Sequence, residues 1–157
     1  MLLSAALLAA AVTGWVYERR VDQFNDTVTH EATVESKSKQ MSILFSCSGK
    51  GDPTYTFVAT RSFDGRYLPD GLRDMPFDVR SGARPAVSIS ILGLRNVAPA
   101  YKGAGSNYDI LDREMTSGEP TMIVRAQMIS AGLVTESFDM RNAKASIEKA
   151  KAGCGLM

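Results

Sequence analysis

Two cysteines, Cys47 and Cys154, are the residues of this chain with the greatest potential for chemistry, and it has no others. A cysteine can act as a nucleophile when a histidine serves as its base, and His30 is the only histidine. Two cysteines can instead form a disulfide, which persists in proteins exported to an oxidising compartment. Because the N-terminus has the character of a secretion signal, we expect a Cys47–Cys154 disulfide and no free reactive thiol.

The first 14 residues have the composition of a signal peptide. The apolar run from Leu2 to Val12 is about as long as a signal core and is shorter than the roughly 20 residues of a membrane span. Small residues follow it, and the first charged residue is Glu18. We therefore expect residues 1–14 to be a signal peptide, cleaved after Ala11 or Gly14, and residues 15–157 to form a single β-rich periplasmic domain. In the alternative, an uncleaved segment 2–17 anchors the protein to the inner membrane.

The overall composition argues against several function classes. The chain of 157 residues is 45% hydrophobic and 22% charged, with a formal net charge of +1. That is enough apolar material for one core, and it contains no excess of basic residues that would attract the phosphate backbone of nucleic acid. We expect a single domain that does not bind nucleic acid.

Other residues with chemical potential have simpler structural explanations. Two cysteines and a distant histidine lack the closely spaced ligand pairs of a zinc site. Asp22, Phe24 and Asp26 form a short acidic group that could hold calcium, but the further oxygen ligands of a calcium loop are missing, so a turn-capping role is expected. Three acids near a predicted helix start complement the helix dipole, namely Asp109, Asp112 and Glu114. The sequence thus predicts no catalytic residue, no metal and no cofactor.

Alternation of apolar and polar residues predicts a mainly β protein. The clearest case is residues 41–48, where Met41, Ile43, Phe45 and Cys47 fall on one face. Further strands are predicted at 27–34, 55–61, 77–80, 87–91, 121–129 and 133–140. Residues 62–74 are expected to form a hairpin tip or long loop, and residues 94–107 an irregular connection.

Two helices are predicted. A short one covers 108–115, with Asn107 as its cap and Gly118 after its end. The second begins after Asn142, which we expect to be its N-cap, and ends at Gly153 as the C′ residue. It carries an apolar stripe of Ala143, Ile147 and Ala150 and a Lys144–Glu148 pair. The predicted fold is an antiparallel β-sandwich or half-barrel whose C-terminal helix is tied to the sheet by the disulfide.

The order of these landmarks resembles that of the VasI-type accessory proteins of type VI secretion and of related periplasmic domains of unknown function. The resemblance is carried by Trp15, then Asp22, Phe24 and Asp26, a strand ending in Cys47, the Phe138-Asp139-Met140 run, and a short helix leading to Cys154-Gly155. It implies a periplasmic, disulfide-linked β module that works through protein contacts, with no catalytic residues to assign.

These observations together predict a non-enzymatic, exported accessory or interaction protein of the cell envelope, associated with type VI secretion. Its partners would be envelope proteins. The alternative is a module that binds a small ligand or cell-wall fragment through loops 62–74 and 94–107. Pro99, Tyr101, Tyr108 and Met115 are candidates for an apolar partner surface, with packing in the core as their default role.

Overall fold

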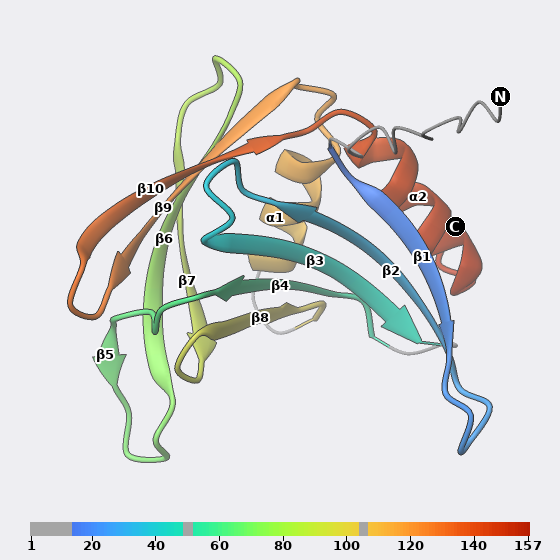
Figure 1. Cartoon of the computed structure of the whole chain (residues 1–157), viewed down its shortest axis with the longest axis horizontal. Coiled ribbons are helices and arrows are strands. Elements are labelled where there is room, and N and C mark those ends of the chain that lie inside the picture. Colours follow the sequence, from blue (N-terminus) through green and yellow to red (C-terminus); the bar gives the residue numbers. More distant parts are fainter. Residues whose placement is uncertain (1–13, 49–51, 104–106) are drawn as a thin grey trace, which may run out of the picture.

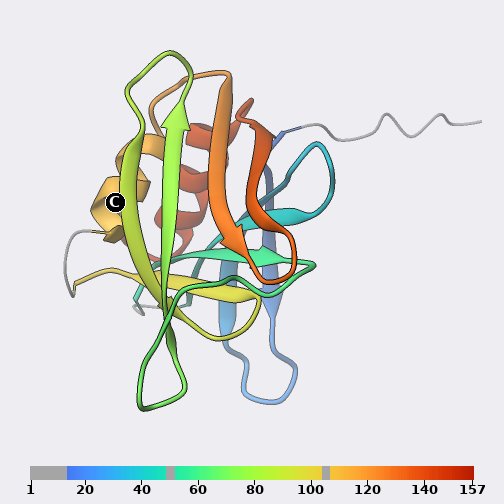
Figure 2. The same ribbon diagram turned by 90° about the vertical axis from the view of Figure 1, so that its left-hand side faces the viewer.

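The computed structural model describes residues 14–48, 52–103 and 107–157 and contains two antiparallel sheets (Figures 1 and 2). The first sheet has the spatial order β1 (Val16–Val21), β2 (Val28–Glu35), β3 (Met41–Ser48), β4 (Thr54–Ala59) and β8 (Val97–Tyr101). The second has the order β10 (Gly132–Asp139), β9 (Thr121–Met128), β6 (Arg73–Ser81) and β5 (Arg66–Tyr67), and β7 (Val87–Gly93) also pairs with β6. The predicted mainly β, sandwich-like fold is confirmed.

The core lies between the two sheets, whose strands run across one another in Figure 1. Each sheet turns its apolar residues inward, so alternate residues of β3 are buried as the sequence pattern predicts. Aromatic rings join the layers: Phe57 of β4 stacks on Phe77 of β6 at 4.8 Å between centroids, and Phe63 meets Phe77 at 5.1 Å. The sheets therefore share one continuous core.

Two helices complete the domain: α1 (Asn107–Met115) and α2 (Ala143–Gly153). The second helix packs on β1, β2 and β3 (Figure 1), and its predicted stripe is buried, with Ile147 fully enclosed. The Lys144–Glu148 pair is present at 3.9 Å. Neither helix, within the residues described, has the length and apolar character needed to cross a membrane.

The predicted N-cap of α2 is confirmed in position, and the predicted C′ residue was wrong. Asn142 is the N-cap residue, but it has a left-handed conformation, with φ 61°, and its side chain makes no capping hydrogen bond. At the other end the C′ residue is Gly155, with φ +68°, while Gly153 is still helical. The N–H of Gly155 bonds the carbonyl of Ala152, and the next N–H bonds that of Lys151, which is the Schellman pattern.

Three strands lie where the sequence did not predict them. β1 was missed because its charged centre, Glu18-Arg19-Arg20, hides any alternation. β8 falls inside the region expected to be irregular, and β5 inside the expected loop of residues 62–74. β1 and β8 are the outer strands of the first sheet. Because an outer strand has one unpaired edge, its alternation of apolar and polar residues is weaker than that of a strand inside the sheet.

Candidate functional site

The predicted disulfide is present and joins the end of α2 to the first sheet. Cys47 lies on β3 and Cys154 directly follows α2, with 6.2 Å between their Cα atoms. Both residues are buried, and the chain has no free cysteine. The alternative in which Cys47 is a nucleophile is therefore wrong, because its sulfur is already bonded.

His30 lies beside this disulfide and packs against α2. It pairs with Cys47 across β2 and β3 and is 8% exposed. Its Nδ1 is 2.8 Å from the hydroxyl of Tyr17, whose ring lies beneath Lys149 Nζ at 4.5 Å. A Cβ on Gly153 would approach His30 Nδ1 to 2.3 Å, so only glycine allows α2 to come this close. His30 thus has a packing role at the junction of helix and sheet.

Two parts of the VasI-type resemblance contact each other in the structure. They are Trp15 and the run Phe138-Asp139-Met140. The indole Nε1 of Trp15 is 3.3 Å from Met140 Sδ, and its backbone N–H bonds the carbonyl of Arg141 at 3.0 Å. Trp15 and Phe138 are both buried. Hydrogen bonds from Arg141 hold the pKa of Asp139 below its ordinary value. Because Trp15 is in the core and β1 begins at Val16, residues 15–17 are part of the folded domain; residues 1–13 lie outside the described part.

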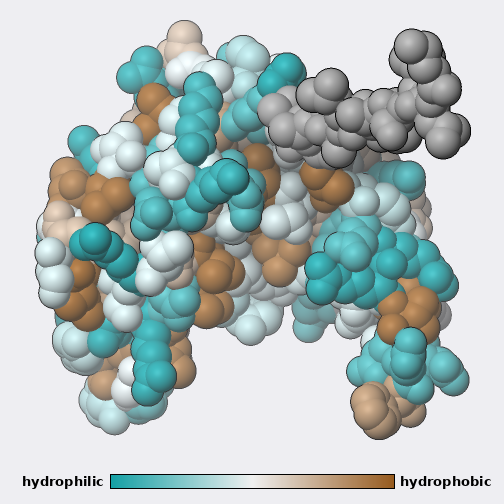
Figure 3. All heavy atoms as spheres, in the orientation of Figure 1, coloured by the Kyte–Doolittle hydropathy of each residue, from teal (hydrophilic) through white to brown (hydrophobic). Residues whose placement is uncertain are grey.

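The other aspartates of this set, Asp22 and Asp26, form a turn between β1 and β2. Asp22 Oδ1 accepts the backbone N–H of Phe24 at 2.8 Å, and the carbonyl of Asp22 accepts that of Asp26 at 2.9 Å. The predicted turn-capping role is thus seen for Asp22, and among the residues described no group of acids, cysteines and histidines could hold a metal ion. Phe24 is fully exposed at the tip of this hairpin, which projects from the body of the molecule (Figure 3).

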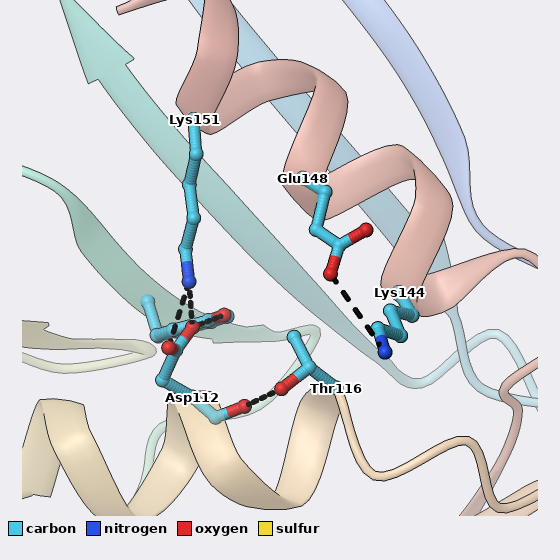
Figure 4. A network of polar contacts seen from close by, with 6 residues as sticks. Asp112, Thr116, Lys144, Glu148 and Lys151 are labelled. Atoms are coloured by element: carbon cyan, nitrogen blue, oxygen red, sulfur yellow. Dashed lines mark hydrogen bonds and ion pairs between the residues drawn. The ribbon is translucent and has the colours of Figure 1, made fainter. Parts of the chain in front are cut away.

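A network of polar contacts connects the two helices (Figure 4). Asp112, in the middle of α1, accepts the hydroxyl of Tyr55 at 2.6 Å and the ammonium of Lys151 at 2.6 and 2.7 Å. Burial, reinforced by this carboxylate, raises the pKa of Tyr55 well above its ordinary value. Asp112 was expected to complement the dipole at a helix start; it instead pins α1 to α2 and β4.

The remaining acids of α1 divide between solvent and core. Asp109 is exposed in the first turn, as a dipole-complementing residue would be. Glu114 is 1% exposed, and Arg84 approaches its Oε1 to 3.2 Å. Its Oε2 has no hydrogen-bond partner among the described residues. Arg113 also approaches Oε1, to 3.7 Å, so two arginines hold Glu114 at the edge of the core, a role the sequence did not suggest.

An apolar groove of about 580 Å³ lies between β7 and β8. Its volume falls in the range of roughly 300–1,000 Å³ that small-ligand sites occupy. No charged side chain is among its described lining residues, which are Leu72, Ser90, Ile91, Leu92, Gly93, Leu94, Val97, Pro99, Ala100, Tyr101 and Asn107. It lies between the two loop regions, 62–74 and 94–107, that the sequence suggested for ligand binding.

Pro99 explains why β7 and β8 separate here. A two-residue turn joins the strands, and Leu94 and Val97 exchange both of their backbone hydrogen bonds at 3.0 Å. The next pair of that kind along the hairpin would be Leu92 with Pro99, but proline has no N–H to donate. The strands therefore diverge after one pair: β7 joins β6 and β8 joins β4.

The groove keeps large apolar side chains in contact with solvent. Leu92 is 51% exposed, Leu94 54% and Tyr101 61%. Of the four candidates for an apolar surface, Pro99 and Tyr101 line the groove, whereas Tyr108 and Met115 are buried in the core. Sequence reasoning did not find Leu92 or Leu94; the available signal was a proline that follows a predicted strand and a short turn.

Three comparisons with known proteins gave no match. No family model matches the chain, and neither a curated protein nor a solved structure does. The resemblance to VasI-type proteins therefore stays a prediction.

Proposed function

We propose that the protein is an exported, non-enzymatic interaction protein of the cell envelope, which serves as an accessory component in type VI secretion. The single observation that carries this proposal is the Cys47–Cys154 disulfide. Disulfides of this structural kind form and persist in oxidising compartments such as the periplasm. The apolar run of residues 2–12 supplies a route to that compartment.

The chemistry of the described residues supports a binding role over a catalytic one. The nucleophile candidate, Cys47, is used in the disulfide, and Nδ1 of the only histidine is engaged by Tyr17. Solvent-exposed leucines and an exposed tyrosine gather instead around one groove. Aromatic and apolar side chains in a concave surface are typical of interaction sites.

The proposal is tested by the compartment and the redox state of the native protein. Cells expressing the full chain would be fractionated, and the mass of the protein measured before and after reduction and alkylation. We expect a periplasmic protein that has lost residues 1–11 or 1–14 and gains two alkyl groups only after reduction. A cytosolic protein with two alkylated thiols before reduction would contradict the proposal.

A second candidate function is small-ligand binding in the groove, which the apolar lining favours for apolar ligands over glycans. A glycan fragment offers many hydroxyl groups, and few side chains of the groove could bond them: Ser90 already donates its hydroxyl to Asp74, and Asn107 donates its amide to the Ser90 carbonyl. Melting-temperature shifts with peptidoglycan fragments and with medium-chain fatty acids would separate the two. A higher melting temperature with either kind of ligand would favour this second function, provided that Leu92→Ser leaves the contacts with envelope proteins unchanged.

A further inference from the structure

We propose that the groove binds an extended segment of another protein, which adds as a strand to the free edge of β7. The segment has an uncharged apolar centre and a carboxylate at each end. This inference deepens the proposed role as an interaction protein, and it does not depend on export.

The free edge of β7 offers main-chain groups that a peptide backbone complements. Leu94 points its N–H and carbonyl toward β8, as its two bonds with Val97 show. Residues two apart in a strand point these groups to the same side, so Leu92 and Ser90 present theirs to the groove. The Ser90 carbonyl already accepts a hydrogen bond from the Asn107 amide, as it would from an adjacent strand. Within the described residues, Leu92 has no backbone partner on this side.

The apolar walls fit the side chains of an added strand. Leu92 and Leu94 come from one wall, and Val97 and Tyr101 from the other. An inserted strand alternates its side chains between two faces and could cover residues from both walls. Added main-chain bonds would supply affinity, and these walls would select apolar residues, as in other cases of strand addition.

Charges at the two ends of β8 define the ends of the partner segment. Arg95 precedes β8 and Lys102 follows it, and both are exposed. Neither forms an ion pair within residues 14–48, 52–103 and 107–157. The nearby carboxylate of Asp74 is already engaged by Arg66 and by the Ser90 hydroxyl. An uncharged groove with a free cation at each end is complementary to an uncharged segment with an acid at each end.

The length of β8 favours an extended segment of another protein over the β1–β2 hairpin tip of a second copy of this chain. The β1–β2 hairpin tip is also apolar and acidic, with exposed Phe24 between Asp22 and Asp26. A backbone hydrogen bond of 2.9 Å holds those two aspartates in one turn. The cations, in contrast, lie beyond the ends of a five-residue strand that is about 17 Å long at roughly 3.3 Å per residue. An extended segment of about seven residues can reach both cations at once, whereas the two aspartates of the β1–β2 turn lie too close together to do so.

The test measures binding of a capped seven-residue peptide to the purified, disulfide-bonded protein. The peptide alternates Val and Thr between two terminal Glu residues. A second peptide carries N-methyl groups on alternate amides, which removes strand hydrogen bonds and keeps the side chains. A third has Lys at both ends. We expect the first to bind, the second to bind about tenfold or more weakly, and the third to bind more weakly than the first only at low salt.

Protein variants locate the site. Leu92→Pro removes the N–H that faces the groove, and Leu92→Ser removes only the apolar side chain; both should weaken peptide binding. Leu133→Ser is the matched control, because Leu133 of β10 is exposed to a similar extent, 61% against 51% for Leu92, but is not part of the groove. Pro99→Val restores an N–H to β8, so the strands can pair further and the groove should close to the peptide while the protein stays folded.

Several other outcomes overturn the inference. If the N-methylated peptide binds as well as the first, the groove does not use main-chain pairing. If no peptide binds, or Leu133→Ser weakens binding as much as Leu92→Ser, the site is wrong. A concentration-dependent dimer that is lost in Phe24→Ser would assign the groove to a second copy. A cytosolic protein that binds the peptide contradicts only the export proposal, and an exported one that does not bind contradicts only this inference.

Discussion

Removing the disulfide will destabilise the folded protein strongly while leaving its structure in place. The crosslink joins residues that are 107 positions apart. In the chain-entropy model, opening a loop of that length gives the unfolded chain enough freedom to lower the free energy of unfolding by about 5 kcal/mol at 25 °C. Domains of this size have roughly 5–15 kcal/mol in total, so the reduced protein should be marginally stable.

The contacts around α2 explain why the native structure should survive. Ile147 is fully buried and contributes on the order of 2 kcal/mol by burial alone. Lys151 adds its ion pair with Asp112, and Gly153 allows close packing on His30. These contacts do not require the sulfur–sulfur bond. The loss should therefore appear in the unfolding equilibrium, with α2 the first element to open.

The assay is urea unfolding of the oxidised protein, the reduced protein and a Cys47→Ala/Cys154→Ala double variant, followed by circular dichroism. A difference of about 5 kcal/mol corresponds to a melting temperature lower by roughly 10–20 °C. Hydrogen exchange of the α2 amides should accelerate before that of β3. Reductant should not change the double variant, which is the control.

Two results would refute this reasoning. If reduction changes the free energy of unfolding by less than about 1 kcal/mol, the loop-closure argument fails for this chain. If the reduced protein instead loses its native circular dichroism without denaturant, the disulfide holds the fold together and the contacts of α2 are insufficient.

Three further predictions concern the junction of the helices and the sheet. Gly153→Ala should lower the free energy of unfolding by about 1–3 kcal/mol, because the added Cβ would meet the His30 ring. Gly155→Ala should lower it by only about 1 kcal/mol, because Gly155 has a positive φ. In urea unfolding, His30→Ala should restore stability to the Gly153→Ala variant and not to the Gly155→Ala variant. Asp112→Asn should cost about 1–3 kcal/mol, since it weakens the contact with α2, and an unchanged unfolding midpoint would contradict that. Because the pKa of Tyr55 is raised in the folded state, its contribution to stability should be intact below pH about 10 and fall at higher pH by up to about 1.4 kcal/mol per pH unit. Burial also raises the pKa of Tyr108, so Tyr55→Phe should reduce, and not abolish, the slope of unfolding free energy measured from pH 8 to 11.

The sequence predicted those elements whose pattern reflects one buried face. Residues 41–48 alternate because every second side chain of β3 enters the core. The apolar stripe of α2 was equally clear, since a helix that covers a sheet buries one side. The disulfide was predicted from the cysteine count and from the apolar, signal-like composition of the first 14 residues, and neither is a local pattern around the two cysteines. For the strand and the helix, local pattern and tertiary environment agree.

The groove could not be predicted because it depends on two strands that join different sheets. Nothing near Leu92 in the sequence shows that β7 leaves the hairpin to pair with β6. Likewise β8 pairs with β4, some 40 positions earlier in the chain. Pro99 lies within residues 94–107, for which the sequence predicts an irregular connection. Its actual effect is to limit a hairpin to one hydrogen-bonded pair.

The two outer edges of the first sheet are protected in different ways, and the difference bears on function. β1 carries Glu18, Arg19 and Arg20 at its centre, and charges of this kind discourage pairing with another chain. β8 has no charge within its five residues, and its proline blocks only one hydrogen-bonding position. Neighbouring β7 likewise has only serine, glycine and aliphatic residues. A chain that shields one edge with charges and leaves the other apolar and open has an edge suited to a partner, and the peptide measurements above test that directly.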